Sequence, residues 1–176
     1  TVHTAMTFAL ISGIVMVFVG LFCTRGALEL MDTPADVIDQ AALYMKIYFC
    51  SMPFFMLYNY GAAVLRAVGD TKRPLLFLII SGAINAVLNL FLVIAFSMGV
   101  AGVAIATVIS QVISCVLVLW CLFTTDSCYR LQISKLGIKG EYLLQIFQVG
   151  VPAGIHSVVI NFSKVLAAAK YQVSKI

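Results

Sequence analysis

The sequence predicts an all-α fold, a polytopic membrane helical bundle with about five transmembrane helices. Of its 176 residues, 62% are hydrophobic and only 10% are charged, whereas a soluble domain carries about 25% charged residues. Charge is absent from the runs 1–24, 47–65, 74–125 and 142–163, and about 20 apolar residues suffice for a helix to cross the ~30 Å hydrocarbon layer. The lipid bilayer is therefore the expected surrounding of the chain.

Two helices are expected before the longest uncharged run. The first covers about 4–24. The second begins with Thr33 as its N-cap and Pro34 at its first helical position, which is a common start signal. It is expected to continue as one helix to about residue 65, with a bend at Pro53, because proline lacks a backbone N–H.

The run 74–125 is too long for a single span and fits two helices. Ser97-Met98-Gly99 is its one turn-like break. The sequence therefore predicts helices over 75–96 and 100–123.

A polar linker over 124–141 follows. Residues 141–148 place apolar and polar side chains on opposite sides, which is typical of a short interfacial helix. Gly150-Val151-Pro152 is expected to break the direction of the chain before a last helix over 153–172. The predicted domains are a partial first lobe (1–125), a cytoplasmic linker with the interfacial helix (126–149) and the first helix of a second lobe (150–176).

Charges cluster between the predicted spans. The stretch LRAVGDTKRP at 65–74 holds Arg66, Asp70, Lys72 and Arg73, and the later linker holds Arg130, Lys135 and Lys139. Since Lys and Arg are enriched in cytoplasmic loops, both basic loops are expected on the cytoplasmic side. The net charge of +4 thus reflects orientation in a membrane, and no nucleic-acid partner is predicted. Arg66 and Asp70 are candidates to pair with each other or with neighbouring loops.

Three of the predicted helices carry a stripe of polar residues at helical spacing. The stripes are Tyr44, Tyr48, Ser51 and Tyr58; Ser81, Asn85 and Asn89; and Thr107, Gln111 and Ser114. Polar groups inside a membrane often line a functional cavity. They also hold neighbouring helices together through hydrogen bonds, and the pattern leaves both interpretations open. Gly102, Ala106 and Ser110 form a row of small residues, which indicates close helix packing.

The sequence contains no catalytic or metal-binding motif of the HExxH, GxSxG or phosphate-loop type. No carboxylate lies in the four uncharged runs, and His3 and His156 stand alone. An enzyme is therefore not predicted, and neither a cofactor nor a metal site is expected.

Several segments resemble the multidrug and toxic compound extrusion (MATE) family, most of all its DinF-like bacterial branch. They are LYNYGAAVLRAVGDTKRPL at 57–75, SGAINAVLNLFLVI at 81–94, MGVAGVAIATVISQ at 98–111 and GVPAGI at 150–155. The basic stretch followed by SGxxNxxxN is the most specific of these features.

The resemblance implies a transporter of twelve helices in two lobes, of which this chain supplies four helices of the first lobe and one of the second. Family members exchange a cationic or amphipathic drug for H⁺ or Na⁺. The resemblance also implies that Tyr44, Asn85, Asn89 and Thr107 line the polar, cation-linked pocket of the first lobe, and Gln111 from the same polar stripe as Thr107 is added to this set. Some relatives carry aspartate at the position of Asn89. Lys164 and Lys170 are a further departure, since the corresponding helix is usually uncharged through its middle.

The expected function is that of a fragment of a secondary active multidrug efflux transporter, a drug:cation antiporter that works by alternating access. Its expected partners are the bilayer of the bacterial inner membrane, small cationic or amphipathic drug-like substrates, and the remainder of the same transporter. The coupling ion is H⁺ or Na⁺. Two alternatives remain: a lipid-linked oligosaccharide flippase of related architecture, and a non-transporting remnant of the transporter.

Overall fold

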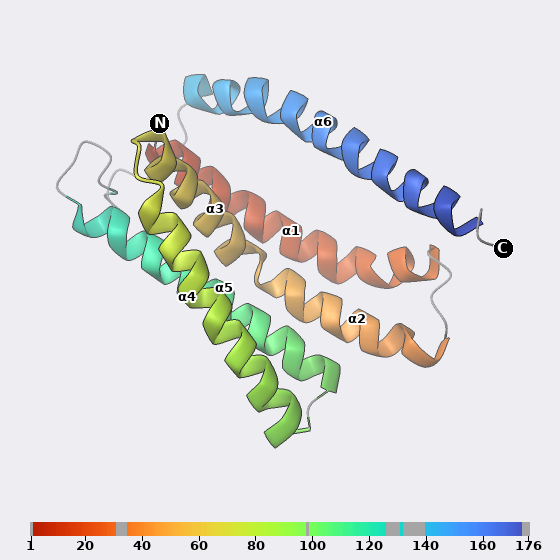
Figure 1. Ribbon diagram of the computed structural model, residues 1–176. Helices are drawn as coiled ribbons and strands as arrows, with labels where there is room; N and C mark the ends of the chain where they lie inside the picture. The colour runs from red at the N-terminus through yellow and green to blue at the C-terminus, as the bar shows by residue number, and fades with distance from the viewer. Residues whose placement is uncertain (1, 31–34, 98, 126–130, 132–139, 174–176) are drawn as a thin grey trace. The chain divides into compact units, whose positions relative to one another are not determined.

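The chain is built from helices throughout the part that its computed structural model describes, namely residues 2–30, 35–97, 99–125, 131 and 140–173 (Figure 1). The helices are α1 (Val2–Leu30), α2 (Ala35–Cys50), α3 (Met52–Ala67), α4 (Lys72–Leu90), the short π-helix η1 (Phe91–Ala95), α5 (Gly99–Thr124) and α6 (Gly140–Val173). Among these, four are long and apolar enough to cross a membrane, or five if α2 and α3 count as one bent span. The predicted all-α membrane bundle is confirmed.

The helix predicted over 34–65 is broken into α2 and α3 at Ser51, and the two parts are bent by 46°. Pro53 lies in the first turn of α3, where its missing N–H costs no hydrogen bond. The Ser51 hydroxyl donates to the Tyr48 carbonyl at 2.6 Å and so satisfies one acceptor at the end of α2. The predicted bend at Pro53 is confirmed, whereas the predicted continuity of the helix is wrong. Thr33 and Pro34, the predicted start signals, lie outside the described residues.

The two spans of the long uncharged run are confirmed as α4 with η1 and α5. α4 begins at Lys72, three residues before the predicted start. The turn between the spans is sharp, because both Ser97 (φ 52°) and Gly99 (φ 53°) adopt the left-handed conformation. Met98 lies outside the described residues.

The break predicted at Gly150-Val151-Pro152 is wrong. α6 runs without interruption through these residues, with Pro152 inside it, and the segment 141–148 forms its first part rather than a separate helix. A proline removes one backbone hydrogen bond, and helices that cross membranes tolerate that loss. Lys164 is exposed on this helix. The Lys170 side chain is outside the description.

The chain forms two compact units, Thr1–Gly137 and Ile138–Ile176. Each is described by itself, and the three domains drawn from the sequence stay a prediction. In the first unit, α5 packs against α2, α3 and α4, while α1 packs against α2 and α3. Direct contact between α3 and α4 is slight. α3 and α4 are therefore held in place mainly by their separate contacts with α5.

Small residues allow the helices of the first unit to approach closely. A Cβ atom at Gly61 of α3 would lie only 2.3 Å from Cγ1 of Val118 on α5. The row of small residues on α5, Gly102, Ala106 and Ser110, is buried. The buried apolar core of this unit is a cluster of five residues from α1, α3, α5 and the segment after α5: Met6, Leu65, Val118, Leu122 and Leu131.

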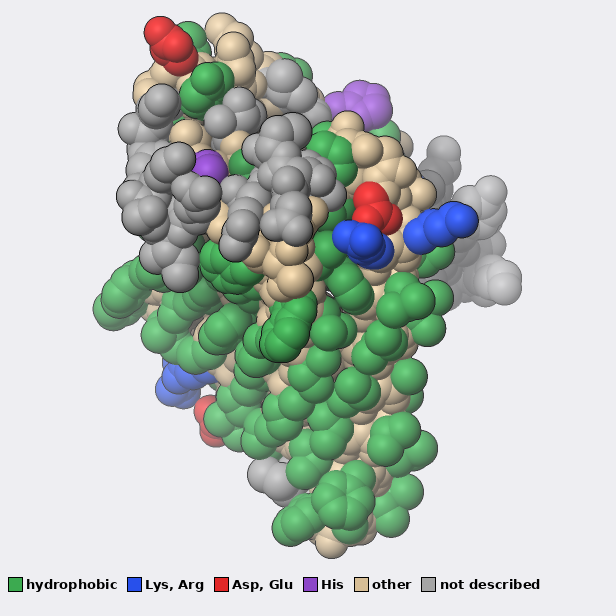
Figure 2. Space-filling model, turned by 90° about the vertical axis from the view of Figure 1, so that its left-hand side faces the viewer, with side chains coloured by type: hydrophobic (Ala, Val, Ile, Leu, Met, Phe, Trp, Pro, Cys, Tyr) green, Lys and Arg blue, Asp and Glu red, His purple; other side chains and the backbone are tan. Residues whose placement is uncertain are grey.

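The outer surface of α4 is apolar, as expected for a helix that faces lipid. Its exposed side chains include Leu75 (58% exposed), Ile79 (62%) and Val87 (66%). Figure 2 shows a face of the molecule on which hydrophobic side chains cover much of the surface and charged side chains are few. Such a continuous apolar surface would be unfavourable in water and fits a bilayer.

In the charged stretch between α3 and α4, Asp70 pairs with Arg73 and not with Arg66. Asp70 accepts from Arg73 Nε through Oδ2 at 3.2 Å and from the Arg73 backbone N–H through Oδ1 at 3.2 Å. The suggested pairing of Asp70 with Arg66 is therefore wrong, because the first turn of α4 brings residue 73 back over residue 70. Gly69, with φ 88°, provides the tight turn that makes this possible.

The predicted orientation can be tested by thiol labelling. After replacement of the native cysteines by serine, Lys72→Cys is expected to resist an impermeant thiol reagent in intact cells, and Asp36→Cys is expected to react. Lys72 is exposed on the molecule, so its resistance would reflect the side of the membrane, and Lys72→Cys should react once the cells are permeabilised. Labelling of Lys72→Cys but not Asp36→Cys in intact cells would reverse the orientation.

Candidate functional site

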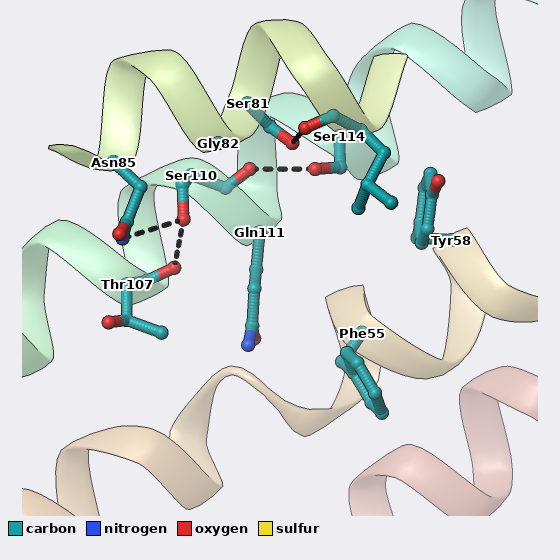
Figure 3. Close-up of a pocket in the computed structure, with 10 residues that line it drawn as sticks. Phe55, Tyr58, Ser81, Gly82, Asn85, Thr107, Ser110, Gln111 and Ser114 are labelled. Carbon is teal, nitrogen blue, oxygen red and sulfur yellow. Dashed lines mark hydrogen bonds between the residues drawn. The ribbon is translucent and has the colours of Figure 1, made fainter. Parts of the chain in front are cut away.

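A pocket of about 340 Å³ lies between α3, α4 and α5 (Figure 3). It forms there because α3 and α4 both pack against α5 and make little contact with each other. Phe55 and Tyr58 of α3 line one side. The polar lining on the other helices consists of Ser81, Asn85, Thr107, Ser110, Gln111 and Ser114.

A chain of hydrogen bonds connects α4 to α5 at this pocket. Asn89 Nδ2 donates to Asn85 Oδ1 at 3.1 Å, and Asn85 Nδ2 donates to Ser110 Oγ at 3.2 Å. Ser110 Oγ in turn donates to the Thr107 carbonyl at 2.8 Å. Asn85 and Asn89 are one helical turn apart, so both amides reach the same network. The network fixes the orientation of both side chains.

The hydroxyl groups of the pocket direct their protons to the backbone of their own helices. Thr107 Oγ1 donates to the Val103 carbonyl at 2.9 Å, Ser114 Oγ donates to the Ser110 carbonyl at 2.9 Å, and Ser81 Oγ donates to the Leu78 carbonyl at 3.1 Å. Each hydroxyl oxygen retains lone pairs that can accept a hydrogen bond or bind a cation. These hydroxyl oxygens therefore remain available to a ligand as acceptors.

Two buried amide oxygens have no hydrogen-bond partner among the described residues: Oε1 of Gln111, which lines the pocket, and Oδ1 of Asn89, which lies one turn beyond the lining residue Asn85. A buried acceptor left without a partner costs about 1–3 kcal/mol. Figure 3 shows the Gln111 side chain extending from α5 toward the side of the pocket where Phe55 lies. A ligand in the pocket that brings N–H donors or a positive charge would satisfy Gln111 Oε1.

The structure brings together three of the five predicted site residues directly. Asn85, Thr107 and Gln111 line the pocket. Asn89 lies one turn beyond Asn85 and is joined to it by a hydrogen bond. Tyr44 is not among the lining residues; it stacks on Tyr48 of α2, with ring centroids 6.2 Å apart. The absence of Tyr44 from the lining agrees with the break at Ser51. Because α2 and α3 point in different directions, Tyr44 on α2 and Tyr58 on α3 no longer share one helical face, and only Tyr58 reaches the pocket.

Sequence reasoning missed several lining residues. The row of small residues predicts only close packing for Ser110, yet this residue stands three residues after Thr107 and four before Ser114, on the same helical face. That spacing was a usable signal. Phe55 and Gly82 carry no such signal, since neither has a polar side chain and only the approach of α3 to α4 and α5 brings them to the pocket.

The side chains of the pocket suit the binding of a small molecule or an ion. The lining residues include no carboxylate, histidine, lysine, arginine or cysteine. Within the described residues, no three His, Cys, Asp or Glu side chains gather as metal ligands would. Neutral oxygens and aromatic rings in an otherwise apolar wall are suited to a cation or an amphipathic amine. The binding roles of the five predicted residues remain predictions.

Two curated proteins that the chain resembles are both named as probable multidrug resistance proteins. The chain is 33% identical over 173 residues to the probable multidrug resistance protein YoeA of Bacillus subtilis, covering 93% of this chain and 37% of that protein. It is 34% identical over 142 residues to the probable multidrug resistance protein YpnP of the same species, covering 81% and 32%. The chain thus spans about a third of the length of the curated relatives it matches.

Solved structures show the same fold. A crystal structure of MATE in the bent conformation matches with a TM-score of 0.81 at 23% identity, covering 87% of this chain and 34% of that one. An inward-facing multidrug resistance MATE family transporter of the MOP superfamily matches with a TM-score of 0.77 at 24% identity, covering 84% and 34%.

The model of the MatE family matches residues 1–91, which is more than half of the chain. This match includes α1 to α4 and therefore Asn85 and Asn89, while the assignment to the DinF-like branch stays a prediction. The chain belongs to the MATE family, as the resemblance of its motifs implies.

Proposed function

We propose that the chain is part of a secondary active transporter that exports small cationic or amphipathic drug-like compounds in exchange for H⁺ or Na⁺. The related proteins named above carry multidrug resistance in their names. Because the chain spans about a third of their length, we infer that the pocket acts together with the remainder of the transporter. A multi-pass position in a bacterial inner membrane follows from the same proposal.

The observation that carries this proposal is the set of neutral oxygens in and beside the pocket that remain free to accept from a ligand or bind a cation. The oxygens Asn89 Oδ1 and Gln111 Oε1 are buried without partners among the described residues. A sodium ion or a drug ammonium group would be bound by such oxygens, and the rings of Phe55 and Tyr58 would contact the apolar part of a drug. Cation and drug would then compete for one pocket, which is what exchange by alternating access requires.

The side chains that line the pocket have different consequences for coupling to Na⁺ and for coupling to H⁺. The lining residues include no carboxylate or histidine, so these side chains would bind Na⁺ through neutral oxygens, and none of them gains and loses a proton near neutral pH. Coupling to H⁺ would need an acid from the remainder of the transporter, held in place by the Asn85 and Asn89 amides. Either ion is compatible with the same exchange mechanism.

The alternative of a lipid-linked oligosaccharide flippase is less well supported. An anionic diphosphate substrate would need Lys or Arg facing the cavity, and neither occurs among the residues that line the pocket. The alternative of a non-transporting remnant predicts no export at all, so one transport experiment addresses both.

Cells that lack their own efflux pumps and express the transporter containing this chain are expected to expel a cationic dye faster than cells with an empty vector. One of two treatments should return the rate to that of empty cells: an ionophore that removes the H⁺ gradient if H⁺ is the coupling ion, or the removal of Na⁺ if Na⁺ is the coupling ion. Dye fluorescence measures the rate. Export that persists without both gradients would contradict antiport, and no export in well-expressing cells would favour the remnant.

A further inference from the structure

A second pocket, of about 280 Å³, lies where the end of α3 meets the beginning of α4. Its lining residues are Tyr58, Arg66, Thr71, Pro74, Leu75 and Leu78. It adjoins the first pocket, since Tyr58 and Leu78 line both. Unlike the first pocket, it contains a positive charge.

Arg66 provides this charge and has no counter-ion in the described part of the chain. It lies in the last turn of α3, and no described carboxylate is within 4.0 Å of its guanidinium. Asp70, the acid closest to it in sequence, has both oxygens engaged by Arg73. An anion in this pocket would therefore meet a guanidinium that is not already paired.

Two hydroxyl groups accompany Arg66. The Tyr58 hydroxyl donates to the Pro74 carbonyl at 3.0 Å, which ties α3 to the first turn of α4 and leaves the phenol oxygen as an acceptor. Thr71 is the N-cap residue of α4, yet its side chain makes no capping hydrogen bond. Its hydroxyl is thus available to donate to a ligand oxygen.

The remaining wall is apolar and open to the surroundings. Leu75 is 58% exposed and Leu78 is 53% exposed. The candidate membrane span of α3 ends at Ala67 and that of α4 begins at Lys72, so Arg66, Thr71 and these leucines lie at the same end of two neighbouring spans, where the edge of the hydrocarbon layer is expected. A ligand that fills this pocket needs an anionic group for Arg66 and a hydrocarbon chain for the leucines.

From this arrangement, we propose that the pocket binds an anionic phospholipid, with its headgroup phosphate on Arg66 and Thr71 and an acyl chain along Leu75 and Leu78. Basic pockets between transmembrane helices at the membrane surface are suited to such headgroups. A free phosphate would use the guanidinium alone and leave the apolar wall without a role. This proposal does not depend on the substrate or the coupling ion of the transporter.

The test is lipid binding by the full chain purified in a neutral detergent, measured by native mass spectrometry. Phosphatidylglycerol is expected to bind more tightly than phosphatidylcholine. Arg66→Gln should weaken phosphatidylglycerol binding about five- to tenfold, the loss expected for one charged contact at a membrane surface. Lys72→Gln removes the same charge from an exposed neighbour that does not line the pocket, and it should leave binding unchanged.

Two further variants keep the test decisive if Arg66→Gln does not fold. Arg66→Lys keeps the charge and should retain most of the binding, whereas Thr71→Val keeps the shape and should weaken it. Equal binding of both lipids, or equal losses in Arg66→Gln and Lys72→Gln, would overturn the site. Inorganic phosphate that displaces phosphatidylglycerol at equal concentration would overturn its assignment to a lipid.

Discussion

Replacing both Asn85 and Asn89 by alanine is expected to reduce drug efflux by the transporter that contains this chain about tenfold or more, and to shift its dependence on pH or Na⁺. The Asn85 amide joins α4 to Ser110 on α5, and Asn89 Oδ1 is buried without a partner among the described residues. A hydrogen bond to a charged group contributes about 1.5–3 kcal/mol, and 1.4 kcal/mol corresponds to a factor of ten. Losing an oxygen that holds the cation should therefore lower efflux and change the ion dependence together.

A matched control separates this effect from a loss of stability. Asn59 of α3 donates to the Phe55 carbonyl of its own helix at 2.8 Å and does not line the pocket. Asn59→Ala should leave efflux and its ion dependence unchanged. If Asn85 and Asn89 only hold helices together, at about 0.6 kcal/mol for each interhelical bond, the double variant should show reduced abundance with the pH and Na⁺ profiles of the parent. Unchanged profiles in a well-expressed double variant would remove both residues from the site.

The polar stripes of α4 and α5 could be predicted from the sequence because these helices are regular where the stripes lie. Residues at i and i+4 share a face of any straight helix, so Ser81 and Asn85 on one helix and Thr107 and Gln111 on the other meet at one pocket. The same reasoning located the turn after Phe96, since Ser and Gly interrupt an otherwise apolar run. Local spacing was sufficient in both cases.

The stripe of Tyr44 to Tyr58 could not be predicted in the same way. Its regular spacing assumes one helix, and the break at Ser51 divides it between α2 and α3. Pro53 and Pro152 look alike in sequence, yet the first stands at a break and the second inside a continuous helix. The backbone of Pro53 packs against Gly13 of α1, far away in the chain, and local spacing does not reveal such a contact.

The spacing of charged residues in the sequence does not determine which arginine pairs with Asp70. Arg66 and Arg73 stand four and three residues from Asp70, and either could pair with it on a helix. The left-handed Gly69 follows the end of α3 and starts a turn that puts Asp70 just before the N-cap of α4, where its carboxylate pairs with Arg73 in the first turn of that helix. The backbone conformation of one residue thus decides which arginine stays available at the second pocket.

The contact between Gly13 and Pro53 leads to the second large expected effect. A Cβ atom at position 13 would lie 2.5 Å from Pro53 Cα and 3.0 Å from Pro53 N. These are backbone atoms, which cannot move aside as a flexible side chain can, so α1 and α3 would have to separate. We expect Gly13→Ala to lower the free energy of unfolding by about 1–3 kcal/mol, the usual cost of overpacking.

Gly26→Ala provides the matched control, because Gly26 lies on the same helix and a Cβ there would meet no heavy atom within 4 Å among the described residues. In that position alanine should stabilise the helix by about 0.5–1 kcal/mol, since glycine loses more backbone entropy on folding. Thermal unfolding of the purified variants in detergent measures both changes, and they should have opposite signs. A Gly13→Ala variant as stable as Gly26→Ala would mean that α1 does not pack on the backbone of Pro53.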